Sequence, residues 1–108
     1  MKIKIQDKEI ELKYSFRSML IYEKITDRSF SPSGLYDIVM FFYATILGSA
    51  KGLILGFDDF LDIIDADPML VTEFSEWITD VITQTNTLRN KHLTEKEQKE
   101  AEEAEKNV

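Results

Sequence analysis

Five aspartates between positions 58 and 67 form the densest group of chemically active side chains in this sequence: Asp58, Asp59, Asp62, Asp65 and Asp67. Asp58, Asp62 and Asp65 are spaced i, i+4 and i+7, so a helix would present them on one face. A calcium-binding loop needs a glycine at its sixth position and a glutamate at its twelfth, and this segment has neither. We therefore expect a solvated acidic helix face, with a magnesium site on the same carboxylates as the alternative.

Other groups on which common enzyme mechanisms depend are scarce. The sequence has no cysteine and one histidine, His92, which lies in a polar C-terminal stretch. Pairs of a nucleophile and a histidine base are therefore not expected in the globular part. Two carboxylates suffice to hydrolyse glycosides, but the spacing of the acids marks no such pair. We predict a protein that is not an enzyme and has no metal or cofactor; a carboxylate-based or metal-dependent enzyme is a distant alternative.

Aromatic residues accompany the acidic segment. One interpretation is that they belong to the core; the other is that part of the set forms an exposed patch, because aromatic anchors surrounded by acids suit a protein interface. The sequence leaves both open. The candidate partner-binding residues are Phe57, Phe60, Asp62, Asp65, Phe74 and Trp77.

Charge is unevenly distributed along the chain. The formal net charge is −7, and residues 37–82 contain nine acidic residues and one basic residue. Residues 1–36 contain seven basic and five acidic residues. Nucleic-acid binding depends on clustered Lys and Arg, so we expect no nucleic-acid partner. A basic or apolar protein partner is favoured instead.

The expected location is the cytoplasm. The opening residues 1–13 alternate charge with isoleucine and contain no apolar core of a signal peptide. The absence of cysteine fits a reducing compartment.

The segments that must position these residues predict a mainly α fold, a small domain of about four helices preceded by a short β-hairpin. Residues 1–5 and 10–12 alternate apolar and charged side chains, which is typical of two paired strands. We expect Ile3, Ile5, Ile10 and Leu12 to face the helices. Apolar periodicity and capping residues predict helices over Phe16–Thr26, Gly34–Ala50, Phe57–Asp67 and Pro68–Leu88, with Ser15, Asp58 and Asp67 as N-caps.

For two of these helices the sequence also predicts which side chains are buried. Residues 34–50 are apolar all round, so we predict a buried central helix; the run is too short for the alternative of a membrane span. In the first helix we expect Arg17, Ser18, Glu23 and Lys24 to face solvent. The residues expected to face inward are Phe16, Met19, Leu20, Tyr22 and Ile25.

The remaining segments are connections and a tail. Gly48, Gly52 and Gly56 predict a loop rather than a continued helix, and the ending of a phosphate-binding glycine loop is missing. Phe30 is expected to anchor the loop after the first helix. We predict a globular domain over residues 1–90 and a polar tail over residues 91–108, flexible or forming a fraying helix, because the tail has almost no apolar side chains.

Two stretches together are similar to a known family: KIKIQDKEIELKYSFRSMLIYEKITDRSF near the start and FDDFLDIIDADPMLVTEFSEWI later. A short basic hairpin, a helix of the YSFRSMLIYEKIT type, a buried helix and an acidic helix ending near EFSEWI resemble the tail assembly chaperones of siphovirus-like bacteriophages and prophages, which have long non-contractile tails. The resemblance covers residues 1–88 and contains no catalytic motif.

The resemblance implies a small helical protein that binds the tape measure protein and helps recruit tail tube subunits during tail morphogenesis in the host cytoplasm. In many members a ribosomal frameshift extends part of the product with a second domain. Homo-oligomers would help such a protein to coat a long rod, because many weak contacts add. The alternative is a small cytoplasmic adaptor or regulatory protein-binding module of a host pathway.

Overall fold

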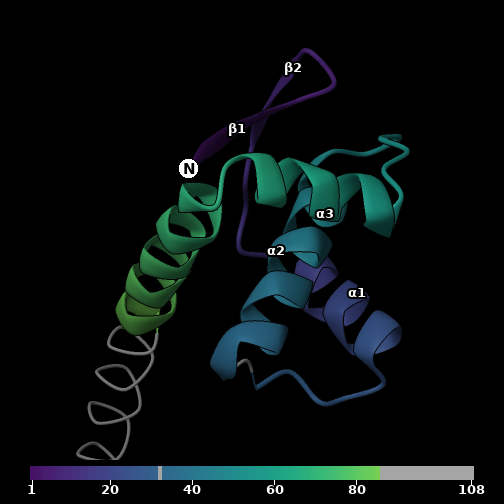
Figure 1. Ribbon diagram of the computed structural model, residues 1–108. Helices are drawn as coiled ribbons and strands as arrows, with labels where there is room; N and C mark the ends of the chain where they lie inside the picture. Colours follow the sequence, from purple (N-terminus) through teal and green to yellow (C-terminus); the bar gives the residue numbers. More distant parts are fainter. Residues whose placement is uncertain (32, 86–108) are drawn as a thin grey trace, which may run out of the picture. The chain divides into compact units, whose positions relative to one another are not determined.

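The computed structural model describes residues 1–31 and 33–85, and the predicted tail lies outside them. Residues 1–78 form one compact unit, and the described residues 79–85 belong to a second. In chain order the elements are β1 (Lys2–Ile5), β2 (Lys8–Glu11), α1 (Phe16–Thr26), α2 (Gly34–Ser49) and α3 (Phe57–Ala66) (Figure 1). A fourth helix occupies the described residues 69–85. The predicted mainly helical fold with an N-terminal hairpin is confirmed.

The hairpin is tighter than the sequence predicted. β1 and β2 pair antiparallel with Ile3 opposite Ile10, and only Gln6 and Asp7 connect them. Both connecting residues are left-handed, with φ of 51° and 63°. Such a two-residue turn matches the twist of the strands, so β2 begins two residues before the predicted start. The predicted inward side chains are all buried, namely Ile3, Ile5, Ile10 and Leu12.

Helix α1 begins and ends where the sequence predicted, but it turns a different face inward. Ser15 caps it, because its Oγ accepts a hydrogen bond from the backbone N–H of Ser18 at 3.1 Å. Ser18 itself is fully buried, contrary to the prediction. The predicted apolar face is also wrong in part, since Phe16 and Leu20 are exposed. Of the predicted inward set, Tyr22 is buried, Met19 is intermediate and Ile25 is 38% exposed.

Gly48 explains why α1 packs by a polar face. A Cβ atom at Gly48 would lie 2.6 Å from Ser18 Oγ and 3.1 Å from Ser18 Cα. The missing side chain therefore lets α1 and α2 approach closely, with small residues at the contact. Ser18 Oγ donates to the carbonyl of Lys13 at 3.2 Å, which satisfies the buried hydroxyl.

Helix α2 forms the centre of the core, as predicted. No residue from Asp37 to Ala50 is exposed, and Phe41 and Phe42 are completely buried. The Phe42 and Phe74 rings stack with centroids 4.5 Å apart and planes within 3°. The first turn differs from the prediction, because Leu35 and Tyr36 protrude into solvent. No helix in the described part of the chain is both long and apolar enough to cross a membrane.

The connection after α2 is the predicted loop. Gly52 adopts a φ of 81°, and the Tyr43 hydroxyl donates to the carbonyl of Leu55 at 2.6 Å. The predicted anchor Phe30 packs its ring 4.8 Å from that of Phe41. Helix α3 has Gly56 rather than the predicted Asp58 at its N-cap. Asp58 lies instead in the first turn, where the helix dipole favours a carboxylate.

Candidate protein-binding site

Two of the predicted partner-binding residues belong to the core. Phe60 and Phe74 have no exposed surface, and the Phe42 ring lies between them, 5.4 Å and 4.5 Å from their centroids. A partner therefore cannot reach either side chain in this fold. For these two residues the structure favours the core interpretation that the sequence left open.

The other predicted residues are accessible but belong to different elements. Asp62 and Asp65 are exposed on α3, and Phe57 on the same helix is 37% exposed with its ring 5.4 Å from the Tyr43 ring. Trp77 belongs to the fourth helix, is partly exposed and packs 5.9 Å from Phe74. Phe57 and Trp77 are thus partly used for internal packing. In the described residues, no group of His, Asp or Glu side chains is arranged to hold a metal ion.

A groove between the start of α2 and the fourth helix offers a more accessible apolar surface. It is open to solvent and has a volume of about 740 Å³. Leu35, which is 73% exposed, and Ile38 line one wall, and Val71 lines the other. We call it the α2 groove; its lining residues are Ser33, Gly34, Leu35, Ile38, Val71, Thr72, Ser75 and Glu76.

A buried carboxylate fixes the wall of the α2 groove. Asp37 accepts hydrogen bonds from the Ser33 backbone N–H at 3.1 Å and from the Tyr22 hydroxyl at 2.9 Å. Arg28 contacts the same carboxylate at 3.2 Å. The hydrogen bond from Ser33, followed by that from Tyr22, lowers the pKa of Asp37 below its ordinary value. Asp37 thus ties the first turn of α2 to α1.

We expect Asp37 to stabilise the fold in a pH-dependent way. Because its pKa is lower in the folded than in the unfolded protein, its contribution is complete above the ordinary value of 3.8 and is lost as the pH falls through the lower folded value. Asp37→Asn should therefore be less stable than the wild type at neutral pH, and the difference should shrink on acidification below pH 3.8. Urea unfolding of both proteins, from neutral pH to below pH 3.8, measures this difference in stability. Asp62→Asn is the matched control, and a wild-type advantage over Asp37→Asn that stayed constant to the lowest pH would contradict the assignment.

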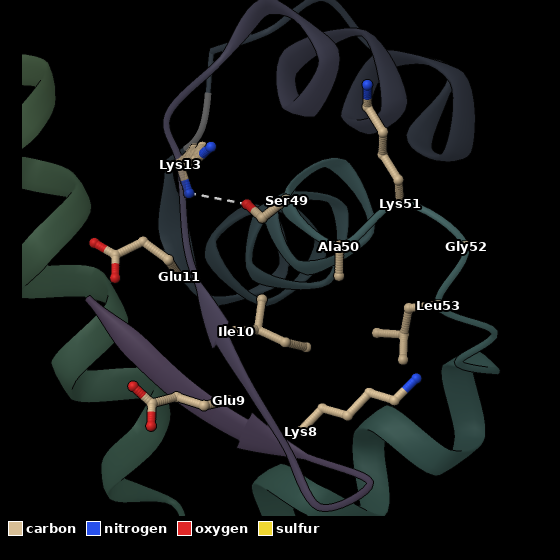
Figure 2. A pocket seen from close by; sticks show the side chains of 10 residues that line it. All are labelled: Lys8, Glu9, Ile10, Glu11, Lys13, Ser49, Ala50, Lys51, Gly52 and Leu53. Carbon is tan, nitrogen blue, oxygen red and sulfur yellow. Dashed lines mark hydrogen bonds between the residues drawn. The ribbon is translucent and has the colours of Figure 1, made fainter.

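A second pocket lies between β2 and the end of α2 (Figure 2). Ile10, Ala50 and Leu53 point into it, while Glu9 and Glu11 point away. The Ser49 hydroxyl accepts a hydrogen bond from the Lys13 backbone N–H at 2.9 Å, so it already has a structural partner. This arrangement favours a packing role for Ser49.

A third recess beside it has a basic lining. Its volume is about 510 Å³, and its charged side chains are Lys13, Arg17 and Lys51. Ser15, Gly48 and Ser49 complete the lining. The N-terminal end of α1 therefore carries positive charge, in contrast to the acidic α3.

Sequence reasoning missed the α2 groove and the exposed side of α1. It placed Leu35 and Ile38 in a helix buried all round, although Asp37 between them indicated that this first turn meets polar groups. The groove also needs residues 33–38 and 71–76 to lie together, and periodicity within one segment carries no such information. Phe16 and Leu20 are exposed although their spacing fits an apolar face.

Comparisons with models of protein families, with curated protein sequences and with solved structures found no match for this chain.

Proposed function

We propose that this protein is a phage or prophage tail assembly chaperone that binds the tape measure protein and helps recruit tail tube subunits. The resemblance of residues 1–88 to that family motivates the proposal. The observation that carries it is the α2 groove, where Leu35 is 73% exposed beside Ile38 and Val71. Large aliphatic side chains held open to solvent are typical of protein-binding surfaces.

The groove fits a helical partner. Two walls from α2 and the fourth helix can receive the apolar face of a third helix, with anchors spaced by three or four residues. Aliphatic and hydroxyl side chains dominate the lining, and Glu76 supplies a charge. The resemblance implies that tape measure proteins are long, largely helical and poorly soluble alone, which suits such a surface.

The acidic side chains add orientation and solubility. Asp62 and Asp65 are exposed, and residues 37–82 contain nine acids and one base. Like charge keeps copies of a coating protein dispersed and orients a basic partner. Phe57 and Trp77, which are partly exposed, stay candidate contacts at the edges of this surface.

Substitution in the groove should abolish capture of the tape measure protein. Leu35→Asp combined with Val71→Asp places two carboxylates where apolar anchors would lie, and we expect at least about a tenfold loss of affinity. Co-expression with a tape measure protein, followed by affinity purification, measures soluble yield and co-purification.

Ile54→Asp is the matched control, because Ile54 is 89% exposed and does not line the groove. It should leave capture unchanged. A double variant that folds and still captures the tape measure protein would move the interface elsewhere. A wild type that never co-purifies with it would favour the host adaptor.

A further inference from the structure

The outward face of α1 is a stripe of basic and apolar side chains. Phe16 and Leu20 lie about 160–200° round the helix from the buried Ser18. Arg17 and Lys24 share this outward side and are exposed, while Phe16 and Leu20 are 82% and 64% exposed. We call Phe16, Arg17, Leu20 and Lys24 the α1 stripe. The basic recess formed by Lys13, Arg17 and Lys51 adjoins it through Arg17.

The outward face of α3 has the opposite charge. Asp58 and Asp62 lie about 160–200° round the helix from the buried Phe60. These two residues and Asp65 are exposed, and Leu61 between them is partly exposed. We call Asp58, Leu61, Asp62 and Asp65 the α3 stripe.

The two stripes match in spacing as well as in charge. Arg17 and Lys24 are seven residues apart, and so are Asp58 and Asp65. Seven residues are two helical turns, about 10.5 Å along the axis. Leu20 lies between the two cations, as Leu61 lies between the two acids. Two helices side by side can therefore form two ion pairs around one apolar contact.

We propose that the α1 stripe of one copy binds the α3 stripe of a second copy of this chain. In the described residues, the ion pairs are Lys2 with Glu9 and Arg28 with Asp37, so the charges of both stripes are available. The contact joins two different surfaces, so each copy can bind one neighbour through α1 and another through α3. Repetition of such a contact gives a ring or an open chain of subunits.

Charge reversal with rescue tests this pairing. Arg17→Glu with Lys24→Glu makes both stripes acidic, and Asp58→Lys with Asp65→Lys makes both basic. Each variant alone should associate at least about tenfold more weakly than the wild type, because like charges then face each other. An equimolar mixture of the two variants should associate again. Sedimentation velocity from about 10 µM to about 1 mM protein measures this.

Salt and a control variant complete the test. Raising the salt from about 50 to about 500 mM should weaken association of the wild type. The control variant, Lys4→Glu with Lys8→Glu, makes the same change in net charge as the α1 variant but places it on the hairpin. It should associate like the wild type. The proposal is overturned if the wild type stays monomeric at low salt, whether or not it binds an oligonucleotide through Arg17. It is equally overturned if charge reversal has no effect, or if the mixture fails to associate.

Discussion

A Phe42→Asp variant is expected to be unfolded at room temperature and therefore to show no cooperative unfolding transition. Phe42 is completely buried, and its ring stacks on Phe74 and meets Phe60 edge-on. The substitution removes a buried ring and leaves an unpaired carboxylate, at a cost of at least about 4 kcal/mol. A domain of this kind has a total stability of about 5–15 kcal/mol. Thermal and urea unfolding followed by circular dichroism measures the loss.

Leu35→Asp is the matched control for this prediction. It introduces the same carboxylate on the same helix, but Leu35 is largely exposed in the first turn. Its melting temperature should stay within a few degrees of that of the wild type. If Phe42→Asp unfolded at the wild-type temperature, α2 would not be the centre of the core.

Gly48→Ala is expected to destabilise the fold although alanine favours helices. The new Cβ would lie 2.6 Å from Ser18 Oγ and 3.1 Å from backbone atoms of Ser18. Ser18 Oγ is held by a hydrogen bond to the Lys13 carbonyl, so α1 itself must shift. We expect a net loss of about 1–2 kcal/mol, because overpacking exceeds the gain of about 1 kcal/mol in helix propensity.

Gly56→Ala is the control for this substitution. Its nearest neighbour would be Asp59 Oδ2 at 3.5 Å, an ordinary contact. Ser18→Gly should partly restore the Gly48→Ala protein, since it removes the nearest atom. Equal stabilities of the two alanine variants in urea unfolding would show that α1 and α2 do not meet closely at Gly48.

The parts of the fold that sequence predicted well are set by local chemistry. Ser15 before an apolar repeat marks the start of α1, and alternating isoleucines mark the hairpin. Residues 38–47 have no polar face, so their burial follows from composition. In each case a few neighbouring residues contain the whole signal.

The parts that were missed depend on contacts between distant segments. Ser18 is buried because Gly48 lies against it, and nothing near Ser18 in the sequence indicates this. Asp37 is buried because Tyr22, Arg28 and Ser33 meet its carboxylate. The left-handed turn at Gln6 and Asp7 lacks the glycine that usually marks one.

Because Ser18 packs closely against Gly48, one side of α1 holds the helix to the domain and the other side is free for recognition. Ser18 and Tyr22 hold the helix to the domain, while Phe16 and Leu20 contribute little to that packing. Substitutions on the outer side should therefore alter recognition at little cost in stability. Such a helix can acquire a new binding specificity by mutation while the domain beneath it stays the same.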